Sequence, residues 1–397
     1  MATQLGGFAN EVSPDLEDAL DDLETEGGGV IYVPAGAYDL SDSEGTTGTD
    51  DQILVWTGSN IALIGEGRDA TILRVKQSGG AVGDDGHILQ ISGADHVTVS
   101  GITFKARAGQ TKGHGIRLSN VDESLFEALT FEGEFGYGIA FRCLQGARCT
   151  TNGRITYTVF RDLIFDGSKY DAIDMKSDNT TNRGVMISNV IVKSFGVDAT
   201  SSQDAAAIDI RGKVIANNLF IDRVNDHTTG IRFRATGGTH SSTGGHKSIV
   251  SGFIIEGGSS CTADTCVGAK INANDVKLAN GYTEDVNIGV HVSDKNALIS
   301  NVVVRNADTV GFRLTNGAKS ARLVNVEAIG GGVGFQVEDR RVSVLNCLAE
   351  SNTTGVKLTA AATDFKIVSC VLDGNTTQKS VPSPSPSGLE EFGTVNW

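Results

Sequence analysis

Charged side chains recur at matched positions in three segments of this 397-residue chain: "YDAIDMKS" from residue 170, "AAIDIRG" from 206 and "GIRFRATGG" from 230. Apolar and charged residues alternate in each segment, so the charged residues share one face of a strand. These residues are Asp174, Lys176, Asp209, Arg211, Arg232 and Arg234. Neighbouring carboxylates can serve as acid and base on a glycosidic bond, or can bind Ca²⁺. Arginine forks suit the carboxylate or sulfate groups of a glycan.

Each of these residues is therefore a candidate for a role in chemistry or binding. The catalytic candidates are Asp174, Asp209, Arg211 and Arg232, and Asp174 and Asp209 are also candidate Ca²⁺ ligands. The substrate-binding candidates are Lys176, Arg234, Asp171, Asp204, His227 and Tyr170. His227 is either a general base or a turn residue, and Tyr170 either stacks on a sugar or lies at the rim. The alternative for the whole set is a solvated surface on which Asp174–Arg211 and Asp209–Arg232 form ion pairs.

The elements that must position these residues repeat along the chain. A small residue followed by alternating apolar residues recurs from "GIRLS" at 115 to "GVKLT" at 355, and the last four intervals are 21, 22, 23 and 21 residues. A second series runs from "NVIV" at 189 to "SCVL" at 369. Repeats of this length without a helical period predict short parallel strands stacked in rungs, a parallel β-helix. Residues 35–381 contain no proline, which favours continuous strand pairing.

Alignment of the rungs predicts columns of side chains. One outward column contains Arg117, Ala140, Asp174, Asp209, Arg232, Lys270, His291 and Arg313. The next outward column contains Ser119, Arg142, Lys176, Arg211, Arg234, Asn272 and Ser293. The core is predicted to receive Ile173, Met175, Ile208, Ile210, Ile231 and Phe233. The charged residues thus form a continuous ladder on an outer face.

The two ends of the chain differ from the repeats. Ser13 and Pro14 predict a helix start, and Leu16, Leu20 and Leu23 fall on one face of that helix. We predict an N-terminal segment with a capping helix at 1–28, a parallel β-helix at 29–378, and a Pro/Ser linker with a tail at 379–397. The tail, which carries Phe392 and Trp397, either caps the last rung or docks on a neighbouring subunit.

The six cysteines fall into three pairs, none with the spacing of a zinc site. Cys143–Cys149 and Cys261–Cys266 each close a short polar loop, which predicts two disulfides. Cys347 and Cys370 are 23 residues apart, or one rung, and are predicted to stack in the core as thiols, although this position also permits a disulfide.

Charge and hydropathy limit the partners. A net charge of −15 argues against nucleic-acid binding. The sequence has no apolar run of 18 residues, so membrane insertion is not expected. No secretory signal is visible at the N-terminus, whereas disulfides fit a protein outside the cell. We therefore expect an extracellular or virion-surface location.

The sequence resembles a known superfamily. A helix followed by "GGGVIYVPAGAYDL" and "NIALIGEG", and then the rung repeats, is similar to the pectin-lyase-like superfamily over about residues 10–375. The resemblance implies an all-β, single-domain right-handed parallel β-helix with an N-terminal capping helix. That superfamily includes lyases, hydrolases, epimerases and viral tailspikes, so the resemblance carries little information on function.

Within the superfamily, the charged segments look most like polygalacturonase-type glycosidases. "GIRFRATGG" resembles their Arg-x-Lys strand, with Arg232 at the arginine and Arg234 at the lysine, and "YDAIDMKS" resembles their acidic strands. The middle rung lacks their adjacent Asp pair, and "GHG" at 113–115 precedes the acidic rungs, so His114 is expected in a turn. Superfamily lyases use an arginine or lysine base with Ca²⁺, a role that Arg211 or Arg232 would fill.

These observations predict a glycan-binding β-helix of tailspike or fibre type, which recognises an extended anionic polysaccharide with or without cleaving it. The alternative is a free secreted polysaccharide lyase or glycoside hydrolase, and a third possibility is a purely structural β-helix. The expected partner is a polysaccharide or surface glycan. A homo-oligomer is also expected, a trimer in the case of a fibre.

Overall fold

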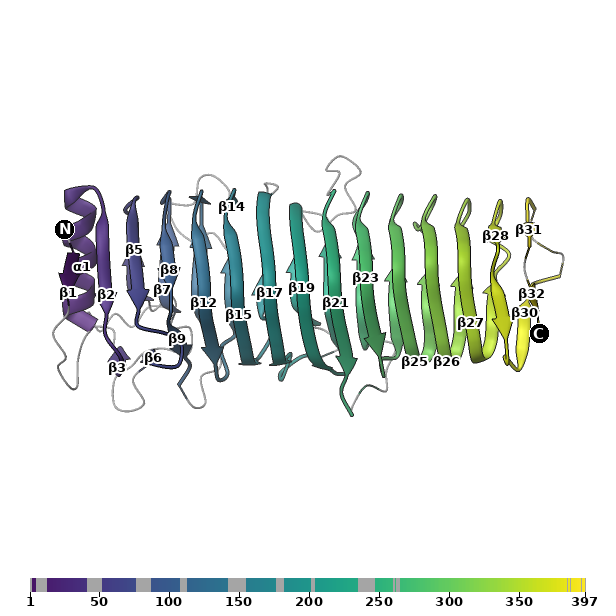
Figure 1. Cartoon of the computed structure of the whole chain (residues 1–397), viewed down its shortest axis with the longest axis horizontal. Coiled ribbons are helices and arrows are strands. Elements are labelled where there is room, and N and C mark those ends of the chain that lie inside the picture. Colours follow the sequence, from purple (N-terminus) through teal and green to yellow (C-terminus); the bar gives the residue numbers. More distant parts are fainter. Residues whose placement is uncertain are drawn as a thin grey trace. The chain divides into compact units, whose positions relative to one another are not determined.

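The computed structural model describes residues 2–4, 13–40, 52–75, 87–107, 113–141, 155–175, 182–200, 204–234, 247–259, 261, 265–383, 385, 387–393 and 395–396. The chain divides into two units, Met1–Asp198 and Ala199–Trp397. In each unit, strands of successive rungs lie side by side (Figure 1). Among the described residues, the strand pairs within each unit are parallel, for example β10 with β13 and β20 with β22. The predicted parallel β-helix is confirmed.

The first unit contains the one helix of the described residues. Its elements are α1 (Ser13–Glu26), β1 (Ala2–Gln4), β2 (Gly29–Val33), β3 (Gly36–Leu40), β4 (Gln52–Trp56), β5 (Ile61–Gly65), β6 (Thr71–Val75), β7 (His87–Ser92), β8 (Thr98–Ser100), β9 (Thr103–Lys105), β10 (His114–Ser119), β11 (Val121–Asp122), β12 (Leu125–Glu132), β13 (Tyr137–Phe141), β14 (Ile155–Thr156), β15 (Val159–Ser168), β16 (Ile173–Asp174) and β17 (Arg183–Phe195).

The second unit contains only strands among its described residues. They are β18 (Ala205–Ile210), β19 (Lys213–Val224), β20 (Thr228–Arg234), β21 (Ile249–Gly257), β22 (Val267–Asn272), β23 (Lys277–Glu284), β24 (Ile288–Val292), β25 (Leu298–Leu314), β26 (Arg322–Val337), β27 (Ser343–Leu358), β28 (Lys366–Val368), β29 (Val371–Asp373), β30 (Thr377–Ser380), β31 (Glu390–Phe392) and β32 (Val395–Asn396).

Helix α1 lies where the sequence predicts it. Leu16 and Leu20 are fully buried and Leu23 is nearly so, and the helix packs against β2 and β4. Gly27 follows its C-terminus with a φ of +83°, a left-handed conformation that glycine adopts without steric cost. The helix therefore covers apolar residues of the first rungs, as expected of a cap. No helix in the described part of the chain is long and apolar enough to cross a membrane.

Stacked apolar side chains fill the interior of each unit. Phe104, Phe131 and Phe165 occupy equivalent positions on three rungs of the first unit, with ring centroids 5.4 and 4.8 Å apart. All six residues predicted to face the core are at most 1% exposed: Ile173, Met175, Ile208, Ile210, Ile231 and Phe233. Each such side chain contributes about 1.5–3 kcal/mol through burial. This burial agrees with the predicted inward face.

The asparagines that begin segments of the second repeat series have a conformational role. Asn301, Asn325 and Asn346 have φ between 51 and 53°, a left-handed conformation that asparagine tolerates better than most residues. Their side chains also form hydrogen bonds from rung to rung, since Asn325 Nδ2 donates to Asn301 Oδ1 and Asn346 Nδ2 to Asn325 Oδ1, both at 3.2 Å. The recurring asparagine therefore marks one bend of each rung.

The structure contains two of the disulfides that the cysteine spacing allows. Cys261 and Cys266 are bonded, as predicted. Cys347 and Cys370 are also bonded, with Cα atoms 4.4 Å apart, so the expectation of a stack of free thiols is wrong. Their positions on adjacent rungs bring the two Cα atoms within the range of a disulfide. The predicted pair Cys143–Cys149 lies outside the described residues.

The tail continues the strand ladder. Strand β31 pairs with β28 through Lys366↔Glu390, and β32 pairs with β29 through Val371↔Val395. Residues of the tail therefore form part of a further rung, which agrees with the capping interpretation. The boundaries predicted at residues 28 and 378 stay predictions.

Candidate functional site

The predicted outward column is in register within each unit. In the first unit, Arg117 pairs with Ala140, which pairs with Asp174. In the second unit, the column runs in the order Asp209, Arg232, Lys270, His291 and Arg313. Arg234 pairs with Asn272 in the adjacent column. The alignment of rungs by their apolar pattern therefore places these side chains correctly.

In the first unit, two histidines and an arginine form a buried chain of hydrogen bonds. The His87 and His114 Nδ1 atoms are 2.8 Å apart, and Arg117 Nη1 lies 2.9 Å from His87 Nε2. The guanidinium can only donate, so His87 accepts a hydrogen bond at Nε2. The neutral His87 ring then carries its N–H at Nδ1, and this N–H donates a hydrogen bond to His114 Nδ1. His114 was expected in a turn, but it begins strand β10, where its ring stacks on that of Tyr137. This histidine is a packed, hydrogen-bonded residue.

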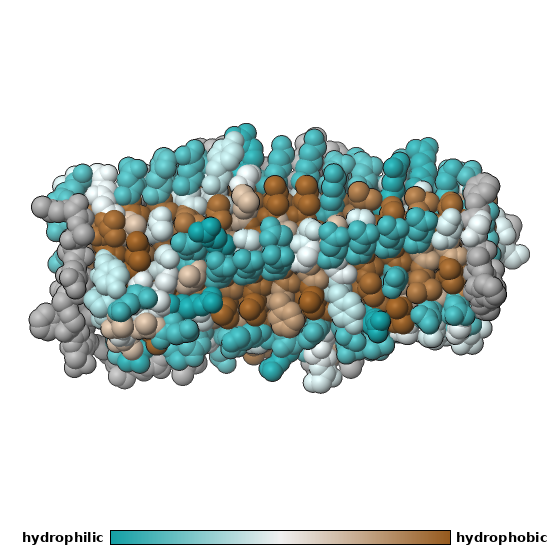
Figure 2. Space-filling view, in the orientation of Figure 1, coloured by the Kyte–Doolittle hydropathy of each residue, from teal (hydrophilic) through white to brown (hydrophobic). Residues whose placement is uncertain are grey.

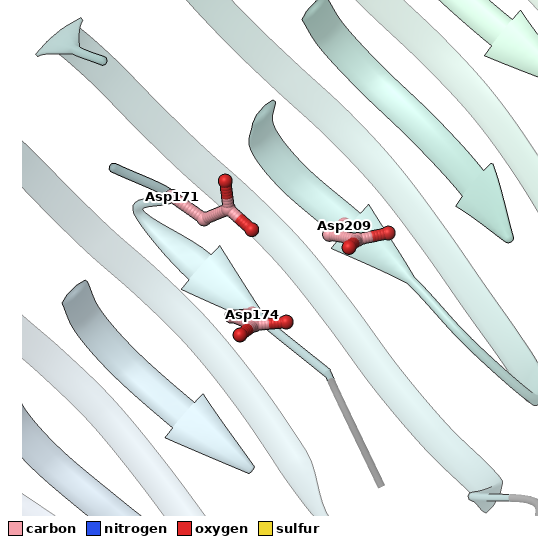
Figure 3. Close-up of side chains that lie close together, drawn as sticks. All are labelled: Asp171, Asp174 and Asp209. Carbon is pink, nitrogen blue, oxygen red and sulfur yellow. The ribbon is translucent and has the colours of Figure 1, made fainter. Parts of the chain in front are cut away.

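Figure 3 shows three aspartates of the predicted site: Asp171 on the turn that enters β16, Asp174 on β16, and Asp209 on β18. Asp171 and Asp174 are 4% and 2% exposed. Tyr170 precedes them, and its ring lies 5.5 Å from that of Tyr137. Lys176 and Arg142 lie outside the described residues. The predicted pair Asp174–Arg211 would join the two units and stays a prediction.

In the second unit, Asp209 is the centre of an ion-pair cluster. Arg211 Nη2 donates to Asp209 Oδ2 at 2.8 Å, and Arg232 Nη2 donates to the same oxygen at 3.2 Å. Arg234 Nε is 3.3 Å from this oxygen. Asp204 extends the cluster, since its Oδ2 lies 2.8 Å from Arg232 Nη1 and its Oδ1 lies 3.6 Å from Arg234 Nη2. Three guanidiniums are thus held by two carboxylates.

Burial distinguishes this cluster from a solvated surface. Asp209 is 0% exposed and Arg232 is 2% exposed, so the interpretation of Asp209–Arg232 as a solvated surface pair is wrong. The two ions can be buried because each has partners of opposite charge, which offset the cost of removing them from water. The cluster reaches solvent through Arg234 and Asp204, whose side chains are 35% and 47% exposed.

The surroundings of Asp209 fix its protonation state. Burial by itself would raise the pKa of this carboxyl, but Arg232, Arg211 and Arg234 together hold it well below its usual range. Asp209 is therefore ionised at neutral pH and cannot serve as a general acid. The same guanidiniums disfavour a cation at Oδ2, so the chemistry of this oxygen argues against the predicted Ca²⁺ site.

Farther along the column, Lys270 and His291 occupy a half-buried region. Burial lowers the pKa of Lys270, Asp204 opposes this shift, and Arg232 and Arg234 reinforce it. Burial, with Lys270 and Arg313 on either side, lowers the pKa of His291 to about 4. The sequence places both residues in the predicted outward column. It does not identify them as site residues, because a lysine and a histidine match no motif by themselves. Their position in the same column as Arg232 is the signal that could identify them.

His227 lies in the turn between β19 and β20 with a φ of 61°. Its backbone N–H donates to Thr265 Oγ1 at 3.0 Å. These features agree with the prediction of a turn residue.

Comparisons with known proteins identify the fold. No protein-family model and no curated protein matches the chain. A GH87 α-1,3-glucanase catalytic domain in complex with tetrasaccharides is 15% identical, with a TM-score of 0.59 over 92% of this chain and 67% of that one. The tailspike protein of E. coli bacteriophage HK620 in complex with a pentasaccharide is 12% identical, with a TM-score of 0.55 over 98% of this chain and 75% of that one. The Agl-KA catalytic domain is 11% identical, with a TM-score of 0.55 over 99% and 67%. This chain therefore has the right-handed parallel β-helix fold that the sequence predicts.

Proposed function

We propose that this protein binds an extended, anionic polysaccharide on the charged outer face of its second unit, as a tailspike or fibre-type protein of a virion or cell exterior. The fold supports a carbohydrate partner, because the similar glucanase and tailspike structures hold oligosaccharides. The two disulfides support an exterior location. Asp171, Asp174, Lys176 and Tyr170 stay predictions as further contacts to the polysaccharide, and His227 as a binding residue.

The observation that carries the proposal is the fixed position of Arg234. Its guanidinium forms ion pairs with Asp209 and Asp204, and its side chain is nevertheless 35% exposed. A guanidinium that is already oriented loses little conformational entropy when it binds a carboxylate or sulfate. Lys270, on the next rung after Arg232, adds a second cation along the same face. Parallel rungs are about 4.8 Å apart, so this spacing suits an extended chain.

Binding is favoured over cleavage by the protonation states of the catalytic candidates. Asp209 is held ionised, so it can orient hydroxyl groups but cannot donate a proton. Arg211 and Arg232 are paired with carboxylates and remain protonated, which disfavours either one as the base of a lyase. A secreted lyase or hydrolase is the alternative, with Asp174 as its remaining acid candidate. This alternative predicts new reducing ends or unsaturated sugars after incubation with an acidic polysaccharide.

The binding proposal is tested by titrating the protein with polygalacturonate and with neutral dextran. We expect binding of polygalacturonate alone, and a fall in its affinity between about 0.05 and 0.5 M NaCl, because ionic contacts at a partly exposed site are screened. Isothermal titration calorimetry measures both effects. Equal binding of dextran, or an affinity that does not change with salt, would contradict the proposal.

A homo-oligomer is proposed from an apolar column on another face of the second unit. Phe220, Ile254, Tyr282 and Val303 are in register on β19, β21, β23 and β25, and Ile254 is 43% exposed. Apolar side chains also reach the surface in stripes between polar ones (Figure 2). Exposed apolar stripes of this kind are typical of protein interfaces. Light scattering after size exclusion should therefore give a multiple of 41.5 kDa, and a trimer for a fibre, whereas a monomer at all concentrations would refute this proposal.

A further inference from the structure

Three basic side chains follow Arg232 on successive rungs of the second unit. Lys270 on β22, His291 on β24 and Arg313 on β25 are in register, and each is partly buried. The carboxylates of the proposed site, Asp204 and Asp209, contact the arginines at the other end of the column. Neither of them lies within ion-pair distance of Lys270 among the described residues. Arg313 pairs with Glu338, so the unbalanced positive charge of this segment lies at Lys270.

Lys270 shows this imbalance most clearly. Its ammonium makes no ion pair and no hydrogen bond within the described part of the chain, although burial and the nearby Arg232 and Arg234 all disfavour its charge. A half-buried cation without a contacting acceptor costs free energy, because it has lost water without gaining a partner. A bound anion would supply that partner.

His291 lies between Lys270 and Arg313, and its imidazole is the group of this segment whose ordinary pKa is near neutrality. Its Nε2 is 3.0 Å from Thr315 Oγ1, which follows β25. The charged groups that face it are Lys270 from β22 and Arg313 from β25, and Glu338 after β26 lies 3.4 Å from Arg313 Nε. Two cations and partial burial keep the imidazole neutral in the unliganded protein.

We infer that Lys270, His291 and Arg313 form a subsite for an anionic group of the polysaccharide, a carboxylate or a sulfate ester, and that His291 takes up a proton from solvent when this group binds. The inference rests on the proposed function and adds to it a subsite whose affinity depends on pH. The anion pairs with Lys270 and Arg313, which removes the repulsion that keeps His291 neutral. The proton adds to the ring nitrogen that is bare in the neutral imidazole, and no other bond changes.

The coupling between anion binding and protonation of His291 has a definite sign. Bound anion raises the pKa of His291 from about 4 toward its ordinary value, so the complex holds more protons than the free protein between these two values. Affinity must therefore rise as the pH falls through this range. One proton taken up changes the affinity by at most about tenfold per pH unit, and between pH 7 and pH 5 we expect an increase of about tenfold.

The test is titration of the whole protein with dextran sulfate, whose charge does not change in this pH range, at pH 7 and at pH 5. Measurements in buffers of different ionisation enthalpy give the number of protons taken up. We expect tighter binding at pH 5 with uptake of up to one proton by the wild type. The His291→Gln variant should lose most of the increase in affinity between pH 7 and pH 5, whatever its affinity at pH 7, whereas Lys270→Met should bind more weakly at both values.

Two further outcomes separate the inference from the proposed function. If the wild type binds and His291→Gln keeps the full pH dependence, the inference fails and the proposed function stands. If neither dextran sulfate nor polygalacturonate binds at pH 7, the proposed function fails. The inference is then judged by NMR titration of the His291 ring, assigned with His291→Gln, in inorganic sulfate against chloride at equal ionic strength. A pKa of His291 that is unchanged by sulfate overturns it.

Discussion

Replacing Arg232 with methionine should destabilise the protein by about 3 kcal/mol, although the substitution adds an apolar side chain to a buried position. Asp209 would stay fully buried with two of its three guanidinium partners, and Asp204 would lose its shortest ion pair. The pKa of Asp209 should rise, because Arg232 is the strongest of the charges that lower it. Chemical denaturation of the variant at neutral pH measures the loss.

The pH dependence of stability and a second substitution test whether the ion-pair cluster causes this loss of stability. In the wild type, the pKa of Asp209 is lower in the folded than in the unfolded chain, so its ionised form stabilises the protein above about pH 4, and this stability is lost as the pH falls. Arg322→Met, at an exposed position in another column, should change stability by about 0.5 kcal/mol or less. An equal effect of Arg232→Met and Arg322→Met would mean that the cluster contributes nothing.

Arg234→Ala should weaken polygalacturonate binding by about tenfold or more, since a charge-assisted hydrogen bond contributes about 1.5–3 kcal/mol. The stability of this variant should change much less than that of Arg232→Met, because the side chain of Arg234 is 35% exposed while that of Arg232 is 3% exposed. Calorimetric titration of the folded variant gives the affinity.

The control for this variant is Arg322→Ala, which makes the same change in charge at an exposed arginine of the second unit. Its affinity should equal that of the wild type. A comparable loss in both variants would mean that net charge alone governs binding. An unchanged affinity in Arg234→Ala would move the recognition surface elsewhere. The next candidates are residues 143–155, 235–247 and 257–267, which lengthen the intervals between the sequence repeats.

The sequence contains enough information to predict the fold and the register of the site. Ile208, Ile210, Ile231 and Phe233 alternate with charged residues, and only one face of a strand can enter the core, so the pattern determines which side chains share a column. The same logic places Lys270 and His291 in one column with Arg232. Strand periodicity is a local property, which is why these predictions are correct.

Burial of the outer face could not be predicted in the same way. A strand pattern shows which way Asp209 points, but its exposure depends on segments distant in sequence. The disulfide Cys347–Cys370 shows the same limit, since spacing by one rung fits a thiol pair and a disulfide equally well. Oxidation state is a property of the environment and not of the spacing.

The central claim, that the polysaccharide contacts the exposed edge of the charged cluster, is tested most directly by arginine modification. Phenylglyoxal should react with Arg234, which reaches solvent, and much less with Arg232, which is buried. Peptide mass spectrometry after treatment, with and without polygalacturonate, gives the extent of labelling at each residue. We predict that polygalacturonate protects Arg234 while dextran does not, and that exposed Arg322 is labelled equally in all three samples. Full labelling of Arg234 at a polygalacturonate concentration that saturates the protein would contradict the claim.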